Sequence, residues 1–382
     1  MPQYRAGQPV VDDRSLAEAP VSRSVSSANR AGIFAEGSRF GAYVLGPCIG
    51  HGESGRLYRA EHDAVHKPLA LKVFTDESSR SAHGRNRFLR EAQKAATVRH
   101  PSLVNIFDLG VQDGIPYLVM ELLDGEDLDA LLRSRGALDE SAIVDVMVPI
   151  VAGLSALHDA GIVHGDLKTR NVFLVYRSSR EREPKLLDFG TAGVTDASKG
   201  WGASGTRGIF REGSVYLSPE AARGVTLTPL SDQYSLGVML YECALGLNPF
   251  VADTNKEVIR RILSGEYPPL AEHEARPSDT LVRIVERAMS LDPDDRYPDL
   301  RALGRDLLML AGERTRMTWT LSFGQSGPAH GQSLPGSWLA SARYELRHYM
   351  RSLSRDVDWS TTAALTFGLV TFAWAVFIWL SR

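Results

Sequence analysis

The spacing of apolar residues changes near residue 123 of this 382-residue chain. Before that point, runs rich in Leu, Val, Ile and Tyr and broken by glycines predict β-strands, with one helix among them. The strands are expected at residues 43–50, 56–61, 68–74, 104–110 and 117–122, and the helix at residues 85–98. After that point, apolar residues recur at helical spacing in residues 143–158, 231–245 and 281–289. This order predicts an α+β protein of two lobes, with a ligand cleft at the hinge between them.

Composition and charge exclude several classes of protein. The formal net charge is −3, whereas nucleic-acid binders usually carry a strong basic excess, so no nucleic-acid partner is expected. Only two cysteines occur, Cys48 and Cys243, which excludes a disulfide framework and favours a reducing compartment. Residues 1–38 are rich in Ser, Ala, Arg and Gly and hold no apolar run of signal-peptide length. They predict a disordered leader.

A glycine-rich stretch connects the first two expected strands. It reads Gly50, His51, Gly52, Glu53, Ser54, Gly55, Arg56 and Leu57, a G-x-G-x-x-G pattern that a leucine follows. Glycines let the backbone approach phosphate oxygens and point N–H groups at them. The signal is weak alone, because glycine turns are common in hairpins, and the flanking strands argue against a dinucleotide-binding βα turn. The negative charge of Glu53 is unexpected beside phosphates.

A lysine interrupts the third expected strand. Lys72 follows Ala70-Leu71 in an apolar run, and burying its charge is costly unless it is paired. Glu91, on the helix that follows, is the expected partner, and the pair would hold the α- and β-phosphates of ATP. A solvated lysine on a sheet edge is the alternative that this stretch alone leaves open.

The strongest signal is a pair of short segments in the helical half. Residues 164–171 read HGDLKTRN and residues 187–190 read LDFG. Asp166 can accept the proton of an attacking hydroxyl, and Lys168 can steady a transferring phosphoryl group. Asn171 and Asp188 supply oxygen ligands of the kind that Mg²⁺ prefers. Chance does not explain all these fragments in this order and at these separations.

These residues resemble the eukaryotic-like (Hanks-type) protein serine/threonine kinases of bacteria over residues 40–312. Further segments extend the resemblance: residues 213–220 are similar to the end of the activation loop, 232–237 to a buried helix, and 292–296 to a late motif whose arginine pairs with Glu220. The resemblance implies a two-lobed kinase fold over residues 39–312, with an N-lobe at 39–123 and a C-lobe at 124–312. It also implies transfer of the γ-phosphate of ATP to Ser or Thr hydroxyls of protein substrates.

The resemblance also assigns the binding residues. The cofactors would be ATP and Mg²⁺, with Mn²⁺ as an alternative metal, and Asn171 and Asp188 would bind the metal. Met120 would be the gatekeeper. Beyond the glycine-rich stretch, the nucleotide would contact Ile49, Ala70, Lys72, Glu121, Leu123 and Asp127, with Glu121 and Leu123 contributing backbone groups and Asp127 reaching the ribose. The catalytic set would be Asp166, Lys168, Lys72 and Glu91.

Two positions bear on specificity and regulation. Lys168 and Ser214 resemble serine/threonine rather than tyrosine kinases, whereas Arg170 is more usual in tyrosine kinases. Gly165 stands where the family commonly has an arginine that binds a phosphorylated activation loop. Glycine has no side chain for that purpose, so activity is expected not to depend strongly on a loop phosphate.

The end of the sequence predicts a membrane anchor. Residues 359–381 carry no charge, and about 20 apolar residues at ~1.5 Å each span the ~30 Å hydrocarbon core of a bilayer. A transmembrane helix is therefore expected at residues 360–380; the alternative is a buried core helix. A linker at 313–336 and a basic amphipathic helix at 337–358 would precede it. The arginines of that helix place the kinase domain on the cytoplasmic side of the cell (inner) membrane, in a single-pass arrangement.

Alternatives to an active protein kinase belong to other classes. One is a catalytically silent kinase fold, or pseudokinase, that serves as a scaffold, and it is disfavoured because Lys72, Asp166, Asn171 and Asp188 are all present. Another is a small-molecule kinase, disfavoured by the intact segment at 213–220. Self-association for autophosphorylation stays open.

Overall fold

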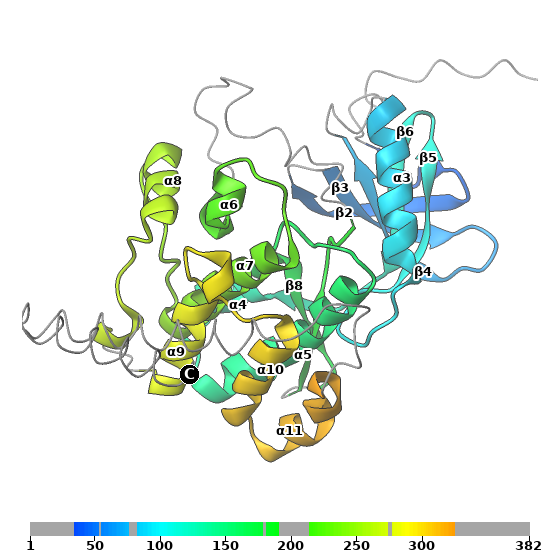
Figure 1. Cartoon of the computed structure of the whole chain (residues 1–382). Coiled ribbons are helices and arrows are strands. Elements are labelled where there is room, and N and C mark those ends of the chain that lie inside the picture. The colour runs from blue at the N-terminus through cyan, green and yellow to red at the C-terminus, as the bar shows by residue number, and fades with distance from the viewer. Residues whose placement is uncertain are drawn as a thin grey trace, which may run out of the picture.

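The computed structural model describes residues 34–52, 55–75, 82–178, 181–190, 214–273 and 277–324. Within them the chain forms a small lobe built on a sheet and a larger helical lobe (Figure 1), as the change of apolar spacing predicts. The expected helices at 337–358 and 360–380 lie outside the described residues. Of the expected leader, residues 34–38 are described, and there the Phe34 ring packs edge-on against Phe40 and Tyr58.

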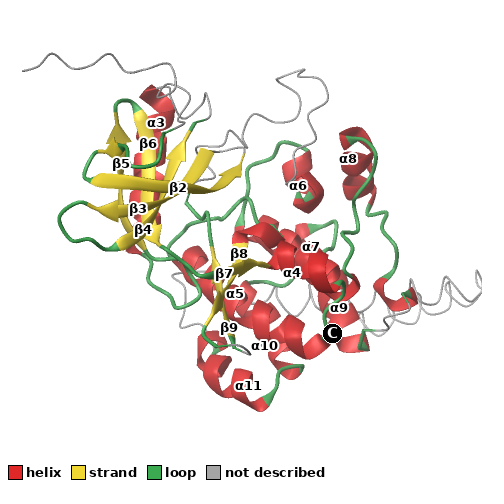
Figure 2. Ribbon diagram, turned by 180° about the vertical axis from the view of Figure 1, so that it is seen from behind, coloured by secondary structure: helices red, strands yellow, loops and turns green. Residues whose placement is uncertain are grey.

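The small lobe is a six-stranded antiparallel sheet in the order β1-β2-β3-β4-β6-β5. Its elements are β1 (Arg39–Phe40), β2 (Tyr43–Gly52), β3 (Gly55–His62), β4 (Pro68–Phe74), β5 (Ile106–Gln112), β6 (Ile115–Glu121) and helix α3 (Ala82–Thr97). Figures 1 and 2 show α3 against one face of this sheet. The rings of Phe74 and Phe88 lie 4.8 Å apart between β4 and α3.

Strand β4 shows how the sequence selects its two faces. Its side chains alternate, because successive residues of a strand point to opposite sides. Leu69, Leu71 and Val73 enter the small cluster on the outer face of the sheet. Ala70 and Phe74 enter the main core below α3. Lys72 lies between them in the alternation and therefore points to the inner face, towards the helical lobe.

The helical lobe is built around two long helices that are buried along most of their length, α5 (Glu140–Asp159) and α7 (Pro229–Leu245). Around them lie α4 (Leu128–Arg135), α6 (Pro219–Ala222), α8 (Asn255–Ser264), α9 (Asp279–Ala288) and α10 (Leu300–Met309), with the short helices η1 (Thr169–Asn171), η2 (Ser214–Tyr216), η3 (Leu270–Glu272) and η4 (Pro293–Asp295). A second sheet of β7 (Gly125–Asp127), β8 (Val172–Tyr176) and β9 (Arg182–Leu186) faces the small lobe (Figure 2). Within the described parts of the chain, α5 is the helix long and apolar enough to cross a membrane, and it is a core helix here.

The linker expected from residue 313 begins with folded structure instead. Helix α11 (Glu313–Trp319) and the turn η5 (Thr320–Phe323) pack back on the helical lobe. Phe323 is 1% exposed, and its carbonyl accepts a hydrogen bond of 3.0 Å from Arg305. This stretch is short and mostly polar, so its apolar residues show no pattern that would predict its packing on the lobe.

A buried ion pair joins α6 to the segment before α10. Nη1 and Nη2 of Arg296 donate to the two carboxylate oxygens of Glu220 at 2.8 and 2.9 Å, and the arginine side chain is 0% exposed. Ser231 also donates to Glu220 at 2.8 Å. Burial alone would raise the pKa of Glu220, but the hydrogen bonds and charge of Arg296 outweigh it and lower that pKa to about 2.

This pair gives the fold a defined pH dependence. The pKa of Glu220 is lower in the folded chain than in the unfolded chain, so its contribution is complete above about pH 4.5 and is lost as the pH falls towards 2. We expect Glu220→Gln to lower the free energy of unfolding by about 3 kcal/mol at pH 7 and by about half as much at pH 3. Urea unfolding at both pH values measures this difference.

Glu257→Gln is the control, because Glu257 pairs with Arg260 and Arg261 on an exposed face of α8. Salt screens exposed pairs, so its small effect should shrink in 0.5 M NaCl while that of Glu220→Gln persists. A Glu220→Gln loss that does not change between pH 7 and pH 3 would contradict the assignment.

Candidate active site

Asp232 fixes the loop that carries Asp166 by hydrogen bonds to its backbone. This carboxylate lies at the start of α7 and is 1% exposed. Its oxygens accept the backbone N–H groups of His164 and Gly165 at 2.8 Å each, and Nε2 of His158 lies 2.8 Å away. Gly165 adopts φ +74°, a left-handed conformation that glycine reaches without steric cost. Asp232 therefore sets the backbone path just before Asp166.

The imidazole of His164 joins this loop to the segment before Asp188. Nε2 lies 2.9 Å from the carbonyl of Leu187, and a carbonyl only accepts, so Nε2 carries the hydrogen. Nδ1 then accepts the backbone N–H of Asp166 at 3.3 Å. One buried ring thus connects the two segments that the sequence singles out as catalytic and metal-binding.

Three of the predicted residues meet at Asp166. Nζ of Lys168 lies 2.7 Å from its Oδ2, and Nδ2 of Asn171 donates to its backbone carbonyl at 2.7 Å. The Asp166 side chain is 45% exposed, which leaves its carboxylate accessible to a hydroxyl group. Since the amide nitrogen of Asn171 is turned to the backbone, its Oδ1 is the atom left for a cation.

Lys72 pairs with Asp188 across the cleft between the lobes. The distance from Nζ to Oδ2 is 2.7 Å, and Lys72 is 8% exposed. Burial alone would raise the pKa of Asp188, but the charge and hydrogen bond of Lys72 outweigh burial and hold that pKa below its usual range. Lys72 is thus a buried, paired cation and not a solvated edge lysine.

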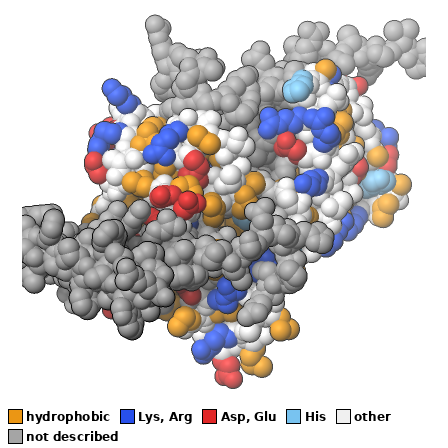
Figure 3. Space-filling view, viewed as in Figure 1, with side chains coloured by type: hydrophobic (Ala, Val, Ile, Leu, Met, Phe, Trp, Pro, Cys, Tyr) orange, Lys and Arg blue, Asp and Glu red, His pale blue; other side chains and the backbone are white. Residues whose placement is uncertain are grey.

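The expected pair between Lys72 and Glu91 is not formed. Oε1 of Glu91 lies 3.0 Å from Nε of Arg87, one turn earlier on α3. The helix carries four basic residues and a single acid, and Figure 3 shows Lys and Arg gathering over α3; these residues are Arg85, Arg87, Arg90 and Lys94. A nearby arginine on the same helix therefore competes with Lys72 for this carboxylate.

The glycine-rich stretch is the hairpin of β2 and β3. Gly50 pairs with Leu57, His51 with Arg56, and Gly52 with Gly55. Glu53 and Ser54, at the tip, lie outside the described residues. A Cβ at Gly55 would lie 1.9 Å from the carbonyl oxygen of Val73, so only glycine lets β3 approach β4 here. The third glycine thus has a packing role in the sheet.

The apolar residues expected around the nucleotide line up on neighbouring strands. Ala70 on β4 pairs with Met120 on β6, and both are buried. Leu57 and Leu123 are partly buried against the main core, whereas Ile49 is exposed at the end of β2. These side chains form an apolar patch on the strands beside the hinge.

The hinge contains an ion pair that the sequence reasoning missed. Oε1 of Glu121 accepts from the backbone and side chain of Asn105 at 2.8 and 2.9 Å, and from Nζ of Lys185 at 3.0 Å. Lys185 is 4% exposed in β9. Lys185 follows Arg182 and Glu183 in this strand, so its surroundings in the sequence give no sign that it is buried and paired. Asp127, expected at the ribose, caps α4 by accepting from Ala130 at 2.7 Å.

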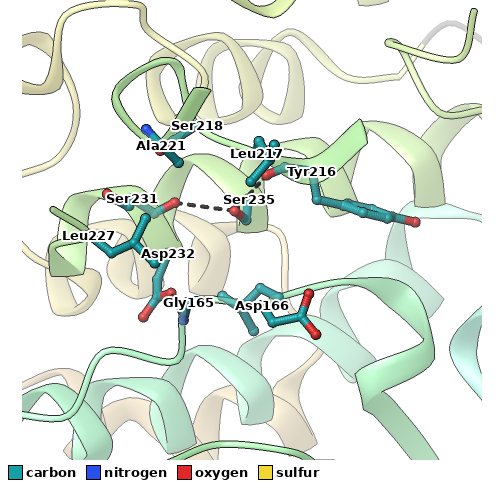
Figure 4. Close-up of a pocket in the computed structure, with 11 residues that line it drawn as sticks. Gly165, Asp166, Tyr216, Leu217, Ser218, Ala221, Leu227, Ser231, Asp232 and Ser235 are labelled. Carbon is teal, nitrogen blue, oxygen red and sulfur yellow. Dashed lines mark hydrogen bonds between the residues drawn. The ribbon is translucent and has the colours of Figure 1, made fainter. Parts of the chain in front are cut away.

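A hydroxyl relay fixes the other side of the loop. Oη of Tyr216 donates to Glu242 at 2.6 Å and lies 2.9 Å from Oγ1 of Thr169. Ser214 at the start of the same turn is buried. Figure 4 shows the small recess beside these residues, with Gly165 and Asp166 on the loop side and residues 216–218 opposite. Residues 191–213, which lead up to the segment similar to the end of the activation loop, lie outside the described residues.

Comparison with known proteins decides the family. The protein kinase domain family matches residues 43–305 of the chain. The chain belongs to the protein kinase family. Serine/threonine-protein kinase pkn3 of Myxococcus xanthus is 32% identical over 308 residues, covering 80% of this chain and 56% of pkn3. Serine/threonine-protein kinase PknL of Mycobacterium tuberculosis is 32% identical over 271 residues, covering 71% of this chain and 66% of PknL. The chain spans less than two thirds of the length of either relative.

Solved structures show the same fold. The kinase domain of Mycobacterium tuberculosis PknI superposes with a TM-score of 0.57 at 24% identity, covering 73% of this chain and 100% of that domain. At this identity the likeness concerns the fold alone. The two-lobed kinase fold, with a β-rich N-lobe and a helical C-lobe, is confirmed.

The position of Glu91 leads to a prediction about the kinase domain. Glu91 follows Phe88 by one turn of α3, and the Phe88 ring packs on Phe74 of β4, so Glu91 lies on the part of the helix nearest the strand that carries Lys72. Glu91→Gln alone removes an i,i+4 surface pair, and we expect a loss of no more than about 0.5 kcal/mol in the free energy of unfolding. Asp188→Asn leaves Lys72 without its counter-ion unless Glu91 replaces it. The double variant should therefore lose about 2 kcal/mol more than the two single variants together, by urea unfolding.

Arg87→Ala combined with Asp188→Asn is the matched control. This double variant releases Glu91 from Arg87 and keeps its carboxylate. Its loss in the free energy of unfolding should therefore not exceed the sum of the losses of its two single variants. Simple additivity of Glu91→Gln and Asp188→Asn would mean that Glu91 does not reach Lys72.

Proposed function

We propose that this chain is an active serine/threonine protein kinase that transfers the γ-phosphate of ATP to Ser and Thr hydroxyls of proteins. One observation carries the proposal: Asp166, Lys168 and Asn171 are held at hydrogen-bond distance from one another on a loop fixed by Asp232. The ion pair between Lys72 and Asp188, in the cleft between the lobes, supports the same proposal. The relatives named above support serine/threonine specificity.

The donor set suits magnesium. Asp188 has a lowered pKa and is ionised, and Asn171 has its amide oxygen free of the bond to Asp166. Among the described residues no group of three or more His, Cys, Asp or Glu side chains could hold a metal alone. Mg²⁺ commonly binds through one or two protein oxygens together with substrate phosphates and water, so these residues fit. When bound, the metal neutralises phosphate charge during transfer.

Each side chain has one task in the transfer. Asp166 orients the attacking hydroxyl and accepts its proton as the new bond to phosphorus forms. Lys168, 2.7 Å from Asp166, offers its ammonium group to the phosphoryl group as it leaves ATP. Lys72 binds the α- and β-phosphates, for which it exchanges part of its contact with Asp188.

Two other functions are less well supported. A catalytically silent scaffold would be expected to lose one of the charged groups, and Lys72, Asp166 and Asp188 are all in place. A small-molecule kinase would not need the protein-substrate segment, yet Glu220 at its end is tied to Arg296. The first observation favours an active enzyme, and the second favours a protein substrate.

The test is phosphoryl transfer by residues 1–335 with Mg²⁺ and labelled ATP. We expect label on Ser and Thr of the chain or of a generic acceptor protein, and a loss of at least a thousandfold in Asp166→Asn, because the variant cannot accept the proton. ATP binding without any transfer by the unmodified chain would favour the scaffold. The same assay after phosphatase treatment tests Gly165: a hundredfold drop would contradict independence from a loop phosphate.

We also propose that residues 360–380 anchor the kinase in the inner membrane, with the kinase domain in the cytoplasm. The proposal rests on the uncharged stretch at 359–381 and on the four arginines that step by four residues before it. The full chain should stay with membranes after carbonate extraction, and residues 1–335 should be released. Recovery of the full chain in the soluble fraction would contradict it.

A further inference from the structure

The segment after the last helix of the family match folds back on the kinase domain. The match ends at residue 305, yet α11 and η5 continue to Phe323. The Phe323 ring fills the space over Gly304 of α10, where a Cβ would lie 2.4 Å from the ring. Figure 1 shows α11 below α10 and α5. The packing of Phe323 on Gly304 brings the preceding helix, α11, against the helical lobe.

Helix α11 uses two residues one turn apart to contact the domain. The hydroxyl of Thr315 donates to the carboxylate of Asp145 on α5. The ring of Trp319 packs on the imidazole of His100, with centroids 5.7 Å apart and planes tilted by 34°. Trp319 is partly buried against the main core, whereas Met317, on the opposite side of α11, is 76% exposed.

His100 is a junction between α3 and the strand that leads to Asp188. Its Nδ1 accepts the backbone N–H of Ser102 at 3.2 Å, and its carbonyl accepts that of Leu103 at 3.0 Å. The carbonyl of Ser102 in turn accepts the N–H of Leu186 at 2.8 Å. Leu186 is the last residue of β9, two positions before Asp188.

The contact partners of His100 leave it little freedom. Burial, and secondarily the positive charge of Lys185, lower the pKa of His100, so Nδ1 stays unprotonated at neutral pH and keeps its acceptor role. On α5, a Cβ at Gly153 would lie 3.3 Å from Nδ1. The Trp319 ring contacts the same imidazole. Removing Trp319 therefore loosens the ring that shapes the turn between α3 and β5.

We propose that Trp319 is a positioning residue for phosphoryl transfer: by packing on His100 it fixes the turn at residues 98–105, and with it the end of α3 and the strand that presents Asp188. The proposal rests on the kinase activity proposed above. Trp319 acts only through His100 and touches none of the reacting groups. The region that connects the kinase domain to the expected membrane segment is thereby tied to the geometry of the cleft.

The test compares the full chain in detergent micelles with four single variants and with the double variant that combines Trp319→Ala and His100→Asn. Trp319→Ala removes the ring, and Trp319→Phe keeps an aromatic ring. His100→Asn keeps an acceptor for the N–H of Ser102 but removes the stacked imidazole. Met317→Ala is the matched control on the exposed side of the same helix. The measurements are kcat and the KM for ATP, the Kd for ATP, and hydrogen exchange of residues 82–97.

Trp319→Ala and His100→Asn should each lower kcat/KM about tenfold, and the double variant should be no worse than either. Trp319→Phe and Met317→Ala should stay within twofold of the unmodified chain. Exchange in residues 82–97 should quicken about tenfold in the two impaired variants only. Independent, multiplying losses, or a lower melting temperature with unchanged kinetics and exchange, would overturn the proposal. If the unmodified chain transfers no phosphate, the activity proposal fails, while the Kd for ATP and the exchange of α3 still decide the coupling.

Discussion

The active site depends on a carboxylate that water does not reach. A buried charge costs several kcal/mol unless hydrogen bonds and nearby dipoles compensate for it. At Asp232 two consecutive peptide N–H groups and the imidazole of His158 supply that compensation at 2.8 Å. Since the two N–H groups belong to His164 and Gly165, this compensation also dictates the course of the loop. The loop that carries the reactive side chains is thereby fixed to α7, which is buried along most of its length.

The parts of this structure that follow from short-range rules could be predicted from the sequence. Alternation along β4 places Lys72 on the inner face, and helical spacing identifies α5 and α7. Asp166, Lys168 and Asn171 lie within six residues of one another, and so short a loop allows few arrangements in which they do not come into contact. The hairpin of β2 and β3 follows from two apolar runs around glycines.

The parts that depend on competition between distant groups could not be predicted. Two carboxylates, Glu91 and Asp188, could pair with Lys72, and Asp188 holds it while Glu91 pairs with Arg87. The partner of Lys185 lies 64 residues away on another strand. The fold of residues 313–323 depends on the packing of Phe323 over Gly304. Helix α11 has only seven residues, which is too short for a pattern of apolar residues to predict this packing.

Helix α5 has a consequence for how the chain is made. It is apolar enough to pass for a membrane span, yet most of it is buried at the centre of the helical lobe. The helix that packs most extensively on it, α10, begins at Leu300, whereas α5 ends at Asp159. A ribosome that adds about 5 to 20 residues per second needs roughly 7 to 28 s to complete the intervening chain. During synthesis α5 is therefore an apolar helix without its main covering helix for several seconds, and of the elements that pack on it, β9 is made first and can shield it.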